Sequence, residues 1–114
     1  MQTREISHRF NFFAFPAPDV GGAWVAHCLE LDLVAQGTDP DHAIRMLVEA
    51  MHMVATSQRQ WPPFPVRQAP DEAWVAQSMA PIVGHIDVTV RYHFEGARPV
   101  LDTIAPAQPQ LLAG

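Results

Sequence analysis

The segment 40–57 constrains the fold most, because it predicts one long helix that is apolar over most of its circumference. Asp39 is a suitable N-cap and Pro40 a suitable first helical residue, since a proline there leaves no amide hydrogen unpaired. The polar side chains recur every three or four residues and form one narrow stripe: His42, Arg45, Glu49, His52 and Thr56. A sheet can cover only one side of such a helix. We expect the C-terminal segment or a second subunit to cover another side.

We therefore predict a homo-oligomer, either a dimer or a tetramer, whose interface includes apolar side chains of this helix. The predicted interface residues are Met46, Met51, Met53 and Val54. Helical methionines fill cores and interfaces more often than they line ligand sites, because their flexible side chains adapt to irregular neighbours.

Alternation with a period of two predicts strands on both sides of the helix in the chain. Residues 5–15 carry aromatic side chains at both even and odd positions, which indicates a strand covered on both faces near its C-terminal end. A glycine-containing turn at 19–22 and a second strand at 23–29 complete a hairpin. A short third strand follows at 34–36. Residues 85–94 alternate most clearly and predict a half-buried strand in an antiparallel sheet.

The order strand, strand, strand, helix, strand predicts one α+β domain over residues 1–95, with a small antiparallel sheet and one main helix on one face. The proline-rich segment 61–70 predicts a connector, and 71–79 a short helix with Trp74 on its inner side. Residues 96–114 are rich in Pro, Ala and Gln and predict an irregular C-terminal tail. A chain of 114 residues has room for one core of this kind.

Three consecutive motifs carry a family resemblance. They are the turn Asp19-Val20-Gly21-Gly22, the run Trp24-Val25-Ala26-His27-Cys28-Leu29-Glu30-Leu31-Asp32, and the helical run Leu47-Val48-Glu49-Ala50-Met51. In order and spacing they resemble the HicB antitoxin family, over about forty residues from Phe12 to Met51. Two positions depart from the family pattern: Leu29 stands where proline is frequent, and Gly37 is followed by one residue fewer before the threonine.

The resemblance implies a partial RNase H-like fold, oligomerisation and a protein-binding function. HicB proteins neutralise a small basic RNA-cleaving toxin, HicA, by covering its active surface, and many carry a C-terminal DNA-binding module. After Gln60 this sequence has no second helical pair, no ribbon-helix-helix pattern and no basic stripe. Direct DNA binding is therefore doubtful for this chain.

The charge balance suits a basic partner. The net charge is −5, and all seven basic side chains are arginines. An acidic protein attracts a basic partner and speeds their encounter. Asp19 lies in the hairpin turn, and Glu30 and Asp32 follow the second strand, so the resemblance makes these three the candidate partner-binding residues. The alternative is that they are ordinary solvated turn residues.

The sequence predicts no enzyme, no catalytic residue, no metal site and no cofactor. RNase H-type catalysis needs several carboxylates around two metal ions, yet the centre of the first strand holds Phe10, Phe12 and Phe13. His42 and His52 would lie about 15 Å apart along the helix and could not share an ion. Cys28 has apolar neighbours, which indicates a buried side chain rather than a nucleophile.

No apolar run reaches the length of a membrane span, and the polar first residues do not resemble a signal peptide. We therefore expect a cytoplasmic protein without membrane contact. The alternative function is an orphan oligomeric domain that binds a small molecule, or acts as a regulator, without a toxin partner. Tryptophans and histidines around a cleft would favour that alternative.

Overall fold

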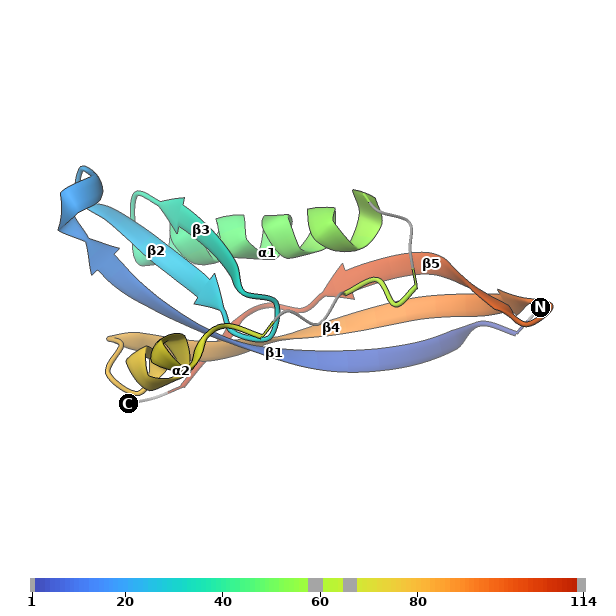
Figure 1. Cartoon of the computed structure of the whole chain (residues 1–114). Coiled ribbons are helices and arrows are strands. Elements are labelled where there is room, and N and C mark those ends of the chain that lie inside the picture. Colours follow the sequence, from blue (N-terminus) through green and yellow to red (C-terminus); the bar gives the residue numbers. More distant parts are fainter. Residues whose placement is uncertain (1, 58–60, 65–67, 113–114) are drawn as a thin grey trace.

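A computed structural model describes residues 2–57, 61–64 and 68–112. The fold is α+β: a curled antiparallel sheet carries one helix on each face (Figure 1). The strands run in the order β3-β2-β1-β4-β5, and β6 pairs with β4 beside this series. Their bounds are β1 (Arg4–Ala17), β2 (Ala23–Cys28), β3 (Leu33–Gly37), β4 (Ile82–Glu95), β5 (Arg98–Pro106) and β6 (Gln110–Leu111). The helices are α1 (Pro40–Ser57) and α2 (Asp71–Gln77), and a short 3-10 turn, η1 (Pro18–Val20), joins β1 to β2.

The predicted secondary-structure elements are confirmed where the sequence pattern was strong. Helix α1 has the predicted bounds, and Asp39 Oδ1 accepts a hydrogen bond of 2.8 Å from the backbone N–H of His42. This bond satisfies one of the amides that a helix N-terminus leaves unpaired, so Asp39 is the N-cap. Strand β4 extends the predicted segment 85–94 at both ends, and α2 forms with Trp74 partly buried against the sheet.

The prediction of an irregular tail over residues 96–114 is corrected by the structure. Strand β5 pairs with β4 from Val88↔Pro106 to Glu95↔Arg98, and β6 adds a short pairing at Gly84 and His85. Prolines at both ends of β5 and a register shift opposite Arg91 and Tyr92 hide the alternation that marks a strand. Pairing with β4, which is distant in sequence, therefore specifies this strand more than its own pattern does.

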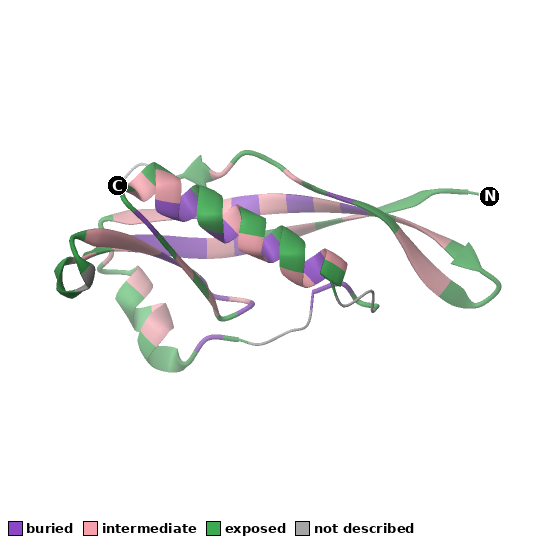
Figure 2. Cartoon of the chain, turned by 90° about the horizontal axis from the view of Figure 1, so that it is seen from above, coloured by how far each residue is buried: buried purple, intermediate pink, exposed green. Residues whose placement is uncertain are grey.

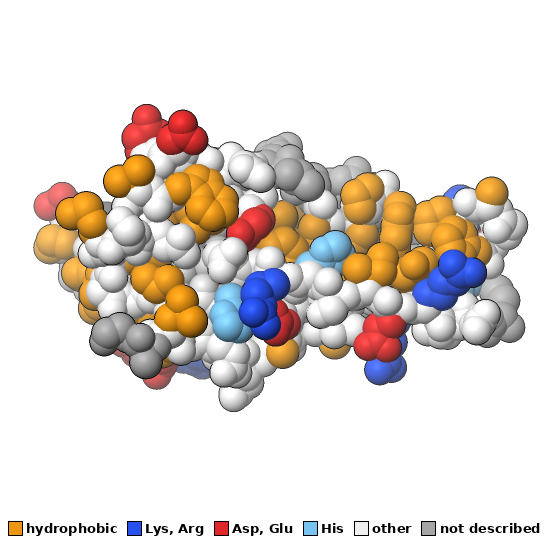
Figure 3. All heavy atoms as spheres, turned by 90° about the horizontal axis from the view of Figure 1, so that it is seen from below, with side chains coloured by type: hydrophobic (Ala, Val, Ile, Leu, Met, Phe, Trp, Pro, Cys, Tyr) orange, Lys and Arg blue, Asp and Glu red, His pale blue; other side chains and the backbone are white. Residues whose placement is uncertain are grey.

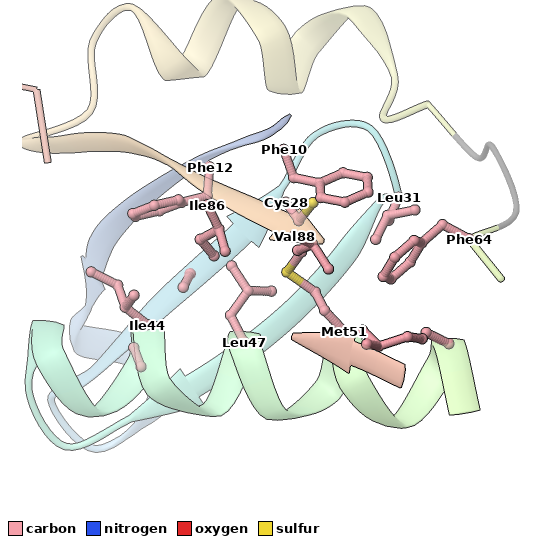
Figure 4. Packing of buried hydrophobic residues seen from close by; sticks show 14 of the residues in the cluster. Phe10, Phe12, Cys28, Leu31, Ile44, Leu47, Met51, Phe64, Ile86 and Val88 are labelled. Atoms are coloured by element: carbon pink, nitrogen blue, oxygen red, sulfur yellow. The ribbon is translucent and has the colours of Figure 1, made fainter. Parts of the chain in front are cut away.

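Two cores lie on opposite faces of the sheet, as the aromatic pattern of β1 predicted. Even-numbered residues of β1, such as Phe12, pack with α1, and odd-numbered ones, such as Phe13, pack with α2. The larger core has ten labelled side chains in Figure 4, where those of α1 point toward the strands: Phe10, Phe12, Cys28, Leu31, Ile44, Leu47, Met51, Phe64, Ile86 and Val88. The smaller core contains Phe13, Leu29 and Ala69, with Trp74 and Val83 at its margin.

Helix α1 is covered on one side only, so the expectation that most of its circumference is hidden does not hold within one chain. Its buried residues lie on a single face, as the alternating colours of Figure 2 show. They are Ala43, Ile44, Leu47, Met51 and Ala55. On the outer side Met46 is 37% exposed and Met53 is 66% exposed. The apolar residues beyond the buried face therefore lie in contact with solvent.

The molecule is elongated, with extents of 51 × 24 × 23 Å. We call residues 2–9 and 87–103 the distal arm; it projects toward the N-terminus in Figure 1. The other described residues form the body, which contains both helices. The arm has one polar face, which no described helix covers, and one face with aromatic side chains. On the latter, Trp61 lies 4.8 Å from Tyr92 between ring centroids.

Candidate functional site

An open groove with a mostly apolar lining lies between α2 and the sheet. Its volume is about 520 Å³. The sheet side of the groove is lined by Phe13, Phe15 and His27. The opposite side is lined by Ala73 and Ala76 of α2 and by Met79 and Pro81 of the turn that follows α2. We call it the α2 groove. Figure 3 shows apolar side chains gathered over this end of the molecule. A groove of this size is within the range of sites that accept a small ligand or an anchoring side chain of a partner.

A hydrogen bond between His27 and Asp32 fixes the wall of the groove that β2 supplies. His27 Nε2 lies 2.8 Å from Asp32 Oδ1, and the ring of His27 lies 5.3 Å from that of Phe13. Asp32 adopts a positive φ of 47° in the turn between β2 and β3. The imidazole is 14% exposed, whereas the carboxylate is 43% exposed. The pair therefore presents a carboxylate to solvent beside an otherwise apolar wall.

Negative charge is concentrated in the body. Eight of the twelve carboxylates belong to it, and Arg45 is its one guanidinium within the described ranges. These carboxylates are Asp19, Glu30, Asp32, Asp39, Asp41, Glu49, Asp71 and Glu72. Glu72 also lines the α2 groove. The distal arm has four carboxylates and four arginines, several of them paired, such as Arg9 with Asp87 at 2.8 Å. The attraction for a basic partner is therefore strongest at the body.

The structure does not bring the three predicted partner-binding residues together. Asp19 lies in η1 at one end of β2, while Glu30 and Asp32 follow its other end, about 20 Å away for a six-residue strand. Glu30 is engaged within the chain: its carboxylate accepts hydrogen bonds of 2.6 Å from the backbone N–H of Asn11 and 2.9 Å from Asn11 Nδ2. Asp19 is exposed. Of the three residues, only Asp32 contacts a side chain that lines the α2 groove.

The predicted interface residues divide into two groups. Met51 is 1% exposed and belongs to the core under α1, so it cannot contact a second subunit. Its position on the helix matches that of Leu47 and Ala55, which face the sheet. Met46 and Met53 are exposed, and Val54 is half-buried. These three remain available for an interface.

Cys28 is a core residue, as the sequence indicated. Its side chain is fully buried, and burial raises the pKa of the thiol to about 12. Desolvation disfavours the charged thiolate, which is the nucleophilic form. His27 is the next residue of β2 and points to the other face of the sheet, so it cannot activate the thiol.

Within the described ranges, no group of three or more His, Cys, Asp or Glu side chains could hold a metal ion. No helix of the described chain is both long and apolar enough to cross a membrane.

A second concavity of about 520 Å³ lies where the end of α1 meets β5, and its lining includes Thr56, Trp61, Arg98 and Leu101. We call it the Trp61 groove.

Two signals pointed to the α2 groove without identifying it. The odd-numbered aromatic residues Phe13 and Phe15 indicated a second covered face, and the short helix with Trp74 turned inward was predicted. The sequence did not show that this helix covers that face, because a long segment of the chain, including a proline-rich connector, separates the helix from the first strand.

Comparison with family models, with curated proteins and with solved structures found no match for this chain.

Proposed function

We propose that this chain is a HicB-like antitoxin: a protein-binding module that neutralises a small basic RNA-cleaving toxin by covering its surface. The observation that carries the proposal is an apolar groove within the acidic body of the molecule. The proposal includes a partial RNase H-like relationship for the α+β fold, and a cytoplasmic location, where the RNA that such a toxin cuts is found. No chemical turnover is involved.

Charge and shape support the same class of partner. Eight carboxylates against one described arginine in the body attract a basic protein, and complementary potentials raise association rates and exclude wrong partners. Tight protein interfaces usually contain a buried anchor side chain surrounded by polar contacts. The α2 groove offers apolar walls for such an anchor. Glu72 and the Asp32–His27 pair offer partners for its basic neighbours.

In this proposal the acidic residues have different roles. Asp32 and Glu72 contact the partner at the groove, and Asp19 contacts it only if the partner extends along β2. Glu30 acts indirectly, since its carboxylate holds Asn11 and thereby the turn that carries Asp32. The proposal retains a homo-oligomer, and the outer apolar residues of α1, Met46, Met53 and Val54, are one candidate surface for its interface.

The test is a capture experiment with a matched pair of charge reversals. Tagged wild-type chain, Glu72→Lys and Glu49→Lys are each incubated with lysate of the source cells at low ionic strength. Glu49 is exposed on α1, on the other face of the sheet, so its reversal changes net charge equally without touching the groove. We expect wild type and Glu49→Lys to retain one small basic protein in stoichiometric amount and Glu72→Lys to lose it.

The retained protein is then purified alone and mixed with RNA, with and without the chain. We expect it to cleave RNA and the chain to stop the cleavage. The proposal fails if the wild-type chain retains no basic protein, if Glu49→Lys and Glu72→Lys reduce retention equally, or if the retained protein does not cleave RNA.

A second candidate function is binding of a small molecule, favoured by the Trp61 groove. It combines an aromatic ring, the guanidinium of Arg98 and the hydroxyl of Thr56 around a volume typical of ligand sites. Native mass spectrometry of chain purified from the source cells distinguishes the two functions. A retained mass that a Trp61→Ala variant loses supports the second candidate, and an unliganded mass for wild type contradicts it.

A further inference from the structure

The outer edge of β1 in the distal arm is open. Strand β4 pairs with β1 from Arg4 to Ala14, whereas β2 pairs with it only from Phe12 to Ala17. Figure 1 shows β1 at the margin of the arm, with β4 on its inner side. Between the described residues, no backbone hydrogen bond reaches the outer side of residues 5–9. An open edge of this kind is a template for pairing with another strand.

The contacts of Asn11 identify the groups that point outward. Its C=O accepts a 3.0 Å hydrogen bond from Leu29 N–H, and its own N–H donates to Glu30, so both groups point away from β4. Alternate residues of an antiparallel strand direct their N–H and C=O groups to the same side. Glu5, Ser7 and Arg9 therefore present theirs at the open edge. The carboxylate of Glu30 occupies the next N–H and ends the free stretch.

We propose that the open edge of β1 binds the same edge of a second copy of this chain, with the two strands antiparallel around a two-fold axis at Ser7. In this register Ser7 lies opposite Ser7 of the second copy, and Glu5 lies opposite the second copy's Arg9, twice by symmetry. Opposite charges directly across a strand pair stabilise it, and like charges destabilise it. An axis at Glu5 or at Arg9 would place like charges opposite each other.

The charges on the neighbouring strand continue the pattern. Arg9 already contacts Asp87 at 2.8 Å and 3.1 Å, and Arg91 lies 4.0 Å from Glu5. All four side chains belong to the polar face of the arm, because their positions pair directly in the β1–β4 register. The dimer would therefore contain a row Asp87, Arg9, Glu5, Arg91 of alternating sign, the last two from the second copy. This charge order selects a second copy as the occupant and fixes the register.

The first test removes the outward N–H of Ser7. Ser7→Pro cannot donate to a second strand, but it leaves the β1–β4 ladder intact because that N–H does not point toward β4. Ser7→Ala is the matched control, since it keeps the backbone donor. By light scattering at micromolar concentration we expect dimers for wild type and Ser7→Ala and a monomer for Ser7→Pro. Circular dichroism should give the same folded spectrum for all three.

The second test does not depend on the proline variant folding. Side chains opposite each other in a hydrogen-bonded pair have Cβ atoms about 5.5 Å apart, too far for a direct disulfide but within reach of a short thiol-reactive crosslinker. We expect Ser7→Cys to form a covalent dimer with a short bifunctional maleimide, and Thr103→Cys, exposed on β5, to remain monomeric in a denaturing gel. The buried Cys28 does not compete.

Three results would overturn the proposal. One is a monomeric wild-type chain. Another is a folded Ser7→Pro variant that stays dimeric. If Met53→Asp then dissociates the dimer, the interface lies on α1 instead. The third is the absence of a covalent Ser7→Cys dimer, or its equal formation by Thr103→Cys. The proposal does not depend on the antitoxin function, because no step of these tests involves a toxin.

Discussion

The two halves of β1 belong to one continuous strand but have different surroundings. From Phe10 to Ala17 the strand is paired with β2 and β4 and packs between α1 and α2. From Arg4 to Arg9 it is paired with β4 alone, and no described helix covers its polar face. Phe12 is fully buried, whereas Ile6, six residues earlier on the same face, is half-buried.

The difference shows which residues decide how a strand is covered. The even-numbered positions face the α1 side of the sheet and change from Arg4, Ile6 and His8 to Phe10, Phe12 and Ala14. The odd-numbered positions change from Glu5, Ser7 and Arg9 to Phe13 and Phe15. Aromatic side chains at those positions require a second layer, which α2 supplies, because a large apolar surface on an open sheet face is unfavourable in water. Stability should therefore be concentrated in the body and recognition surfaces at its margins.

The largest expected effect is on the body half of β1. Phe12→Ala should lower the free energy of unfolding by about 3–5 kcal/mol, because it removes a fully buried ring and leaves a cavity. Ile6→Ala, on the same strand and face, should cost less, about 1–2 kcal/mol, because part of its side chain is already exposed to solvent. Urea unfolding of both variants measures the difference. Equal losses would contradict the division of β1 into two halves.

The boundary between the halves can be broken at Glu30. Its carboxylate accepts two hydrogen bonds from Asn11, and the site is partly buried. Glu30→Ala leaves a backbone N–H without its charged acceptor and should cost about 1.5–3 kcal/mol. Glu49→Ala, on the exposed side of α1, should change stability by no more than about 0.5 kcal/mol. Thermal unfolding of the two variants measures both losses of stability. A loss for Glu30→Ala as small as that for Glu49→Ala would mean that Glu30 is an ordinary solvated residue.

Helix α1, which covers one face of the body, can be weakened without changing the sheet. Asp39→Ala removes the acceptor for the His42 N–H and should cost about 1 kcal/mol. Asp41→Ala removes only a charge in the first turn and should cost about 0.3–0.5 kcal/mol. Urea midpoints of the pair measure the contribution of the cap. Indistinguishable midpoints would mean that the hydrogen bond contributes no more than the charge does.

Local signals predicted part of this fold and long-range pairing decided the rest. Asp39 and Pro40 mark the start of α1, and Phe12 and Phe13 mark two covered faces; each signal lies within a few residues of the element it predicts. Strand β5 has Pro99 and Pro106 at its ends and is defined by its ladder with β4, so no local pattern identifies it.

The candidate site was predictable only in its parts. Acidic residues around the second strand were singled out, but β2 separates Asp19 from Asp32, and Glu30 turned out to bind Asn11. Met51 was assigned to an interface because the polar stripe defined the exposed side of α1 too narrowly. Its burial depends on the orientation of the helix over the sheet, which the sequence of the helix alone does not fix.

The smallest expected effect belongs to the distal arm. His93 Nδ1 of β4 lies 2.7 Å from Asp102 Oδ1 of β5, and this contact joins the two strands. His93 Nε2 lies 3.4 Å from Glu95 Oε1. Hydrogen bonding to Asp102, and then to Glu95, raises the pKa of His93 above its ordinary value of 6.5. Because the folded-state pKa is the higher one, the charged pair stabilises the hairpin fully below pH 6.5. That stabilisation is lost as the pH rises through the raised pKa.

The effect is small because solvent screens an ion pair at the surface. Amide hydrogen exchange of the β4–β5 hairpin, corrected for its intrinsic pH dependence, should show more frequent opening above the raised pKa than below pH 6.5. His93→Gln should remove this difference, and the amides of the body around Phe12 should not show it in either protein. A ring titration of His93 by NMR with a midpoint at or below 6.5 would contradict the assignment. A pH-dependent opening confined to the arm would instead show that its ends are held by surface charge, whereas the body is held by its two buried cores.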